Sequence, residues 1–227
     1  TRFRNVTGVQ TCALPIYILL GLNQRSELLK VWESDASLRP GRTQIMTAAA
    51  RGNVSEVERL IAARADVNAI DGSGWTSLMY ASGGFKPKET IMKLLGAGVD
   101  PKARTTMGQT ALMAAATPSI YTSADALRLL IDAGAEVNAI DKNGQTSIGF
   151  ALDRILDASE YDFPERVEMI RLLRSRGART DLPDSYGLTA LDRLDIERQQ
   201  VTTPVAIQRY EVIRKILTAE SSSPSRN

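Results

Sequence analysis

Histidine and cysteine, two of the side chains that enzymes use most as nucleophiles, general bases or metal ligands, are nearly absent from this chain. It has no histidine, and its one cysteine is Cys12. Ser–His and Cys–His nucleophile systems and the usual zinc sites therefore lack their essential groups. Neither a Gly-x-x-x-x-Gly-Lys-Ser/Thr loop nor a strand-linked Gly-x-Gly-x-x-Gly occurs in the sequence. We expect no catalytic residue, no metal and no cofactor here.

Two acidic patterns come closest to chemistry, and both have simpler explanations. The Asp71-Gly72 pair suggests a calcium loop, but the 12-residue ligand spacing of such a loop is missing. Asp153 and Asp157 lie four residues apart, a spacing expected on one face of a helix. We interpret this carboxylate pair as part of a solvated helix face.

Basic side chains are densest in one stretch, which contains Arg171, Arg174, Arg176 and Arg179. Such a cluster could receive an acidic peptide or a phosphate, or it could be the solvated outer face of a helix. The second interpretation is favoured because the charge balance is close to neutral. Arg2 and Arg4 account for the whole formal net charge of +2. The composition therefore predicts no nucleic-acid partner.

A short phrase, Gly-x-Thr followed by small or apolar residues, recurs along the chain. It begins at Gly74, Gly108, Gly144 and Gly187, with a fainter copy at Gly41. The spacings between successive copies are 33, 34, 36 and 43 residues. A period of this size predicts a solenoid, in which each unit buries its apolar face against the next.

Each unit is expected to contain two short helices and a returning turn. Small residues such as those of 111–116 begin the first helix, and paired aliphatic residues such as Leu94 and Leu95 mark the second. Glycine follows the second helix in three units, at Gly98, Gly134 and Gly177. Arg64 takes this place in the first unit, so we expect a strained helix end there.

On these residues the chain resembles ankyrin-repeat proteins. The opening of the family phrase matches residues 71–74, 141–144 and 184–187, and its close matches residues 65–68 and 134–138. The resemblance covers about residues 41–218 and implies an all-α solenoid of about five helix-turn-helix units. The expected unit boundaries are 41–73, 74–107, 108–143, 144–186 and 187–218.

The chain departs from the family phrase at two positions. The usual proline is replaced by Ser77, Ala111, Ser147 and Ala190, and the usual histidine by Met79, Met113, Gly149 and Asp192. In the family that histidine helps to tie adjacent turns together by hydrogen bonds. Because methionine cannot replace this role, we expect packing to substitute for it.

The resemblance implies that a protein partner binds at the turn tips and the concave helix face. The residues expected there are Ser73, Trp75, Tyr80, Met107, Gln109, Asn143, Gln145, Phe150 and Tyr186. Trp75 is either an interface anchor or packs over the neighbouring turn. Tyr80 and Phe150 either contact a partner or pack between helices. An insertion at residues 157–164 brings Tyr161 and Phe163, which either fold back as a cover or carry function.

The predicted function is therefore a monomeric protein-binding or scaffolding module. One alternative is an accessory ankyrin region of a larger, truncated enzyme or membrane-anchored protein. Another is an inhibitor or immunity-type partner.

The two ends of the chain raise separate questions. Residues 1–16 resemble translated sequencing-adapter DNA rather than protein, and residues 17–40 are expected to form an N-terminal flank or capping helix. Tyr17–Leu22 is either part of that helix or the end of a signal or anchor segment. No stretch is apolar for long enough to span a membrane. We favour the cytoplasm over a periplasmic or anchored location, and we expect residues 219–227 to form a flexible tail.

Overall fold

The computed structural model describes residues 40–119 and 123–219. The chain divides into one unit at Thr1–Pro40 and a second at Gly41–Asn227, and the fold below is that of the second unit. The expectations for residues 1–16, for Tyr17–Leu22, for the rest of the N-terminal flank and for the tail beyond residue 219 lie outside the described residues.

Regular structure in the described ranges is helical, with one isolated bridge between Ile70 and Thr76. Five helices form an inner column: α2 (Gln44–Ala50), α4 (Ser77–Ser82), α6 (Ala111–Ala116), α8 (Ser147–Leu152) and α10 (Ala190–Gln200). Five form an outer column: α3 (Val54–Ala62), α5 (Pro87–Gly96), α7 (Ala124–Asp132), α9 (Asp162–Ser175) and α11 (Pro204–Thr218). A short 3₁₀ helix, η2 (Ile155–Asp157), precedes α9.

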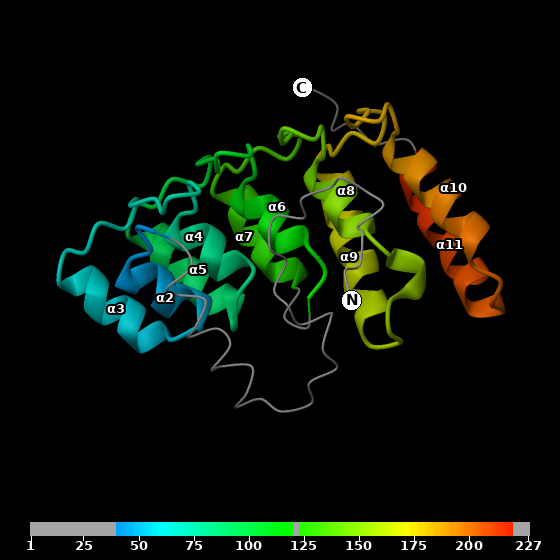
Figure 1. Cartoon of the computed structure of the whole chain (residues 1–227). Coiled ribbons are helices and arrows are strands. Elements are labelled where there is room, and N and C mark those ends of the chain that lie inside the picture. The colour runs from blue at the N-terminus through cyan, green and yellow to red at the C-terminus, as the bar shows by residue number, and fades with distance from the viewer. Residues whose placement is uncertain (1–39, 120–122, 220–227) are drawn as a thin grey trace, which may run out of the picture. The chain divides into compact units, whose positions relative to one another are not determined.

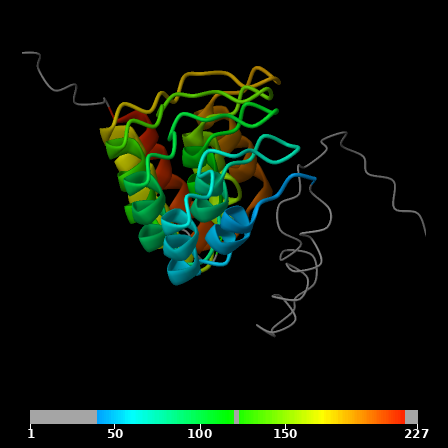
Figure 2. The same ribbon diagram turned by 90° about the vertical axis from the view of Figure 1, so that its left-hand side faces the viewer.

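Each helix packs against its neighbours in the same column and against the other helix of its own unit. Figure 1 shows the units following one another along the stack, with the turns between units along one edge. Figure 2 looks along the stack and shows the two columns of helices beside a row of loops. The all-α solenoid predicted from the repeat is confirmed.

The threonine of the recurring phrase has a local structural role at the start of each inner helix. The N-cap residues of these helices are Thr43, Thr76, Thr110, Thr146 and Thr189, and each side chain accepts a hydrogen bond from the backbone N–H three residues later. A threonine N-cap satisfies one of the N–H groups that a helix leaves free at its start. The phrase therefore marks where an inner helix begins.

The glycine of the phrase allows close approach between units. Gly144 has a φ of +72°, and a Cβ at this position would lie 2.7 Å from the Cα of Asp184 in the next turn along the stack. The outer helix of the first unit ends differently from the others, because Arg64 adopts a φ of +59° where later units have glycine. The expected strain at this helix end is thus present in the backbone.

The methionines that replace the family histidine lie in the core. Met79 and Met113 are buried, as the packing argument predicts, and so is Met46 at the same position of the fainter first copy. Met46 also makes a polar contact, since its Sδ accepts a hydrogen bond from the N–H of Thr43 at 3.3 Å. Asp192 at the last such position accepts from the N–H of Thr189 at 2.8 Å. At both ends of the stack this position therefore makes a local capping bond at the start of its own helix, not a bond between turns.

One expectation about local structure is wrong. Asp153 and Asp157 do not share a helix, because α8 ends at Leu152 and Asp157 belongs to η2. Arg154 between them has a φ of +50°, which breaks the helical path. Within the described ranges, none of the helices combines the length and the apolar composition needed for a membrane span.

Candidate partner-binding surface

The turn that leads into each later inner helix is built around one side-chain oxygen. In the first of these turns, Oδ1 of Asp71 accepts hydrogen bonds from the N–H groups of Ser73 at 2.8 Å and Trp75 at 2.9 Å. The same pair of bonds, to residues two and four positions later, is made by Thr105, Asp141 and Asp184. This closed loop holds each turn in one conformation.

Neighbouring turns are then tied to one another through the backbone. The carbonyl of Ser73 accepts from Thr106 N–H at 3.0 Å, and the carbonyls of Met107 and Asn143 accept in the same way from the following turns at 2.8 Å. The sequence places these three residues at the turn tips, and each of them pairs its turn with the next one. Figure 1 shows these turns in one row along an edge of the stack. Because their carbonyls are used within the stack, their side chains are what they offer to a partner.

In two of the turns the second oxygen of the aspartate accepts from the inner helix that follows the turn. The hydroxyl of Tyr80 donates to Oδ2 of Asp71 at 2.6 Å. Nε of Arg193 donates to Oδ2 of Asp184, also at 2.6 Å. Both donors lie nine residues after their aspartate, on α4 and α10. Burial alone would raise the pKa of Asp184, but hydrogen bonds from Leu188, Tyr186 and Arg193 outweigh it and lower that pKa.

An aromatic pair and a cation occupy the first unit boundary. The rings of Trp75 and Tyr80 have centroids 5.4 Å apart and are tilted by 45°. The guanidinium of Arg42 lies 4.4 Å from the Tyr80 ring centroid, a favourable cation–π distance. Tyr80 is only 5% exposed, whereas Trp75 is half-buried. The buried Tyr80 ring therefore supports Trp75 from the interior, and the Trp75 indole lies nearer the surface.

The remaining predicted residues differ in how much they expose. Gln109, Gln145 and Phe150 are half-buried, Asn143 is exposed, and Tyr186 is 68% exposed at its turn tip. Arg42 and Asp141 were not among the residues predicted from the sequence. The sequence does contain the nine-residue spacing between a turn aspartate and a residue of the inner helix. That spacing predicts nothing until the structure shows that the two side chains are in contact.

The long insertion is anchored to the last two units. Arg166, only 5% exposed, donates to the carbonyls of Ala151, Asp153 and Arg154, which closes the end of α8. Burial lowers the pKa of this guanidinium. Oε1 of Glu197 accepts from Leu156 N–H at 2.8 Å. The insertion therefore has a defined backbone path.

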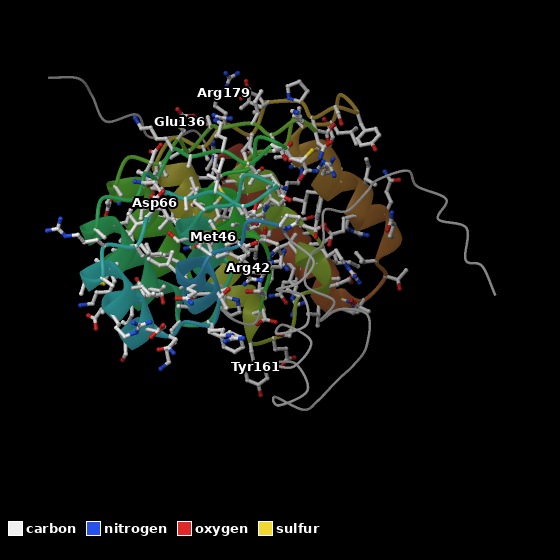
Figure 3. The ribbon with its side chains drawn as sticks, turned by 60° about the vertical axis from the view of Figure 1, so that its left-hand side comes forward. Arg42, Met46, Asp66, Glu136, Tyr161 and Arg179 are labelled. Atoms are coloured by element: carbon white, nitrogen blue, oxygen red, sulfur yellow. The ribbon has the colours of Figure 1, made fainter. Side chains whose placement is uncertain are left out.

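Its two aromatic residues have different surroundings. Phe163 lies beneath the guanidinium of Arg209, 4.8 Å from the ring centroid, whereas Tyr161 is 93% exposed. Phe163 is covered by the protein and Tyr161 is not. Figure 3 places Tyr161 at the far edge from Glu136 and Arg179, which lie beside the turns. The insertion and the turn tips are thus two separate surfaces.

Most of the arginine cluster is committed to contacts within the chain. Arg174 donates to the carbonyls of Ala178 and Ala219, Arg176 pairs with Asp132 at 2.5 Å, and Arg179 pairs with Asp181 at 2.8 Å. These contacts leave little of the cluster for an acidic ligand. The described residues contain no group of three or more His, Cys, Asp or Glu placed to hold a metal.

Comparison with protein families identifies the repeat. Residues 45–84 match the family model described as ankyrin repeats in many copies, and residues 107–142 match the model for the ankyrin repeat. These two segments include parts of the first three units described above.

Two curated proteins are also similar to the chain. A Danio rerio protein named as a palmitoyltransferase, ZDHHC13, is 26% identical over 200 residues, which are 85% of this chain and 28% of that protein. A Bos taurus protein named mitochondrial disaggregase is 46% identical over 58 residues, which are 25% of this chain and 8% of that protein. The chain thus spans less than a third of the length of either relative.

Proposed function

Because this chain is an ankyrin-repeat protein, and such repeats are protein-interaction modules, we propose that it binds another protein through its row of turns and the inner-helix floor. The observation that carries this proposal is the backbone pairing of successive turns at Ser73, Met107 and Asn143. It fixes the backbone from which the tip side chains project before any partner arrives. A preformed surface loses little conformational entropy on association.

Trp75 is the proposed anchor of this surface. Its backbone N–H is held by Asp71, and its ring is supported by Tyr80. A half-buried indole with its conformation already set matches the residues that dominate interface free energies. Tyr80 contributes by positioning, since its own ring is almost fully buried.

A pair of aromatic substitutions tests where the partner binds. Affinity capture with the full chain is compared with capture by Trp75→Ala and by Tyr161→Ala, which removes the exposed ring on the opposite edge. We expect Trp75→Ala to lose the captured protein and Tyr161→Ala to keep it, with unchanged helical content in both. The reverse pattern would move the site to the insertion.

The length of the Danio rerio relative favours a second candidate function. In that case the repeats are the accessory region of a longer protein, and any catalysis resides outside residues 40–219. Sequencing the gene beyond both ends of the present chain tests this. A further domain would support it, and a start codon and a stop codon directly flanking the repeats would reject it.

A further inference from the structure

Asp141 leaves one buried carboxylate oxygen without a hydrogen-bond partner. The residue is 6% exposed. Its Oδ1 accepts from the N–H groups of Asn143 at 2.8 Å and Gln145 at 2.9 Å, which closes the turn. Its Oδ2 has no partner. A buried acceptor without a donor is costly, and native structures rarely leave one without a reason.

The equivalent oxygens elsewhere in the stack show what is missing. Nine residues after its aspartate, Tyr80 supplies a hydroxyl to Asp71 and Arg193 supplies a guanidinium to Asp184. The residue nine positions after Asp141 is Phe150, which has no donor. The turn between those of Asp71 and Asp141 has Thr105 at this position, and a threonine has no second oxygen that needs a donor. Asp141 is therefore the turn aspartate whose donor must come from elsewhere.

We propose that Asp141 and Phe150 form an arginine subsite on the inner-helix floor, which an arginine side chain of the bound protein completes. This proposal rests on the proposed function and names the chemistry of its partner. The arginine would take the place at Asp141 that Arg193 takes at Asp184. A bidentate planar cation suits a carboxylate better than the single ammonium of lysine.

Phe150 adds a second reason to expect a guanidinium. Arginines already lie over aromatic rings at two places in this protein, Arg42 over Tyr80 at 4.4 Å and Arg209 over Phe163 at 4.8 Å. Phe150 is half-buried and stands at the position from which Tyr80 reaches Asp71, so we infer that its ring offers a comparable face beside Asp141. Such a site attracts the cation through both the ring and the charge.

Access requires a small local movement. Oδ2 of Asp141 is buried in the unbound chain, so a side chain near it must move to admit a donor, and the proposal assigns that movement to Phe150. The equivalent position in the preceding unit holds Ala114, a small residue that is only half-buried, which favours such a movement. Helices α6 and α8, which carry the two residues, pack directly against each other.

The premise is tested by supplying the missing donor within the chain. Phe150→Tyr would place a hydroxyl nine residues after Asp141, as Tyr80 stands to Asp71. We expect the melting temperature of the full chain to rise by about 2–4 °C, the shift that one new hydrogen bond gives in a chain of this size. The same change in Asp141→Asn should give a smaller rise, because the hydroxyl then pairs with a neutral amide instead of a carboxylate. An unchanged melting temperature in Phe150→Tyr would overturn the inference, since Oδ2 would then already be satisfied.

The subsite itself is tested with a random peptide library displayed on phage and selected on the full chain. We expect arginine to be enriched at one position of the binders, and their affinity to fall about tenfold or more in Asp141→Asn and Phe150→Tyr. Asp141→Asn keeps the Oδ1 acceptor of the turn and replaces only Oδ2, by an NH2 group. Asp66→Asn, on an exposed aspartate with the same charge change, is the matched control and should leave affinity unchanged.

The outcomes separate this inference from the function on which it rests. Binders without arginine, or binders insensitive to Asp141→Asn but lost in Trp75→Ala, would overturn the subsite and leave the proposed binding surface standing. If the library yields no binder, Nα-acetyl-arginine amide is titrated while the amide NMR signals of Asn143 and Gln145 are followed. Shifts in the wild type that vanish in Asp141→Asn would support the subsite, and the absence of shifts would overturn it.

Discussion

The hydroxyl of Tyr80 donates a 2.6 Å hydrogen bond to Oδ2 of Asp71, and both residues are buried. Through this bond the inner helix α4 is fixed to the turn that precedes it. The same turn holds the backbone of Trp75, so one carboxylate links the helix, the turn and the proposed interface anchor.

Removing this hydroxyl should destabilise the fold. Tyr80→Phe leaves Oδ2 of Asp71 buried without a donor, and we expect the free energy of unfolding in urea to fall by about 1–3 kcal/mol. Tyr210→Phe is the control, because that hydroxyl donates to Asp195 at 2.8 Å from a less buried position. Equal losses in the two variants would contradict a special role for the Asp71 contact.

Close approach between turns predicts a strong effect at Gly144. Gly144→Ala combines a positive φ with a Cβ that would lie 2.7 Å from Asp184 Cα. Gly98→Ala has a similar φ, +82°, but open space around its Cβ. We expect Gly98→Ala to cost about 1–2 kcal/mol and Gly144→Ala about 1–3 kcal/mol more. Urea unfolding of both variants measures the difference, and similar costs would show that the neighbouring turn can yield.

The strained end of α3 predicts a stabilising substitution. Arg64 is exposed and has a φ of +59°, a conformation that glycine adopts without a Cβ penalty. We expect Arg64→Gly to raise the free energy of unfolding by about 0.5–1 kcal/mol, after allowing for the greater freedom of the unfolded chain. Arg64→Ala keeps the strain and should give no gain. A gain in both variants would point to the arginine charge instead.

The burial of Glu197 predicts that the stability of the fold depends on pH, beginning above the ordinary pKa of a glutamate. Burial is the largest influence on this carboxyl and raises its pKa in the folded chain. At pH values between the unfolded and the folded pKa, the carboxyl is therefore protonated in the folded state and ionised in the unfolded state. The stability contributed by the neutral carboxyl is therefore fully present below the unfolded pKa and is lost as pH rises through the folded one.

This dependence is measured by comparing the wild type with Glu197→Gln in urea at pH values from 4 to about 8, a range that spans the ordinary and raised pKa of a glutamate. The amide oxygen can still accept from Leu156 N–H, but it does not titrate. We expect Glu197→Gln to gain stability relative to the wild type as pH rises. Parallel pH profiles would show that the carboxyl titrates normally.

Much of the fold follows from short-range interactions and was predictable from the sequence. The N-cap bond of Thr76 reaches Met79, three residues away, and the turn bonds of Asp71 reach two and four residues. Such contacts depend on the local order of residue types, so each recurrence of the phrase predicts the same turn and the same helix start. The period between recurrences then predicts the stack.

The candidate site was predictable only in part. The row of tips at Ser73, Met107 and Asn143 follows from the repeat, but Tyr80 remained undecided between a partner contact and packing. The structure places its ring in the interior, on Asp71. Whether an aromatic side chain on the floor is covered depends on the donors and acceptors beneath it, which periodicity does not reveal.

The sequence by itself determined the all-helical solenoid, the positions of its turns and the start of each inner helix. Only the tertiary structure decided how the insertion is held, with Glu197 binding Leu156 across 41 residues and Arg209 binding its carbonyl across 53. It also decided that Asp141 lacks the donor that Asp71 and Asp184 possess. The reason is physical: local bonds are encoded in neighbouring residues, whereas a buried polar group is satisfied or not by whatever the packed units bring beside it.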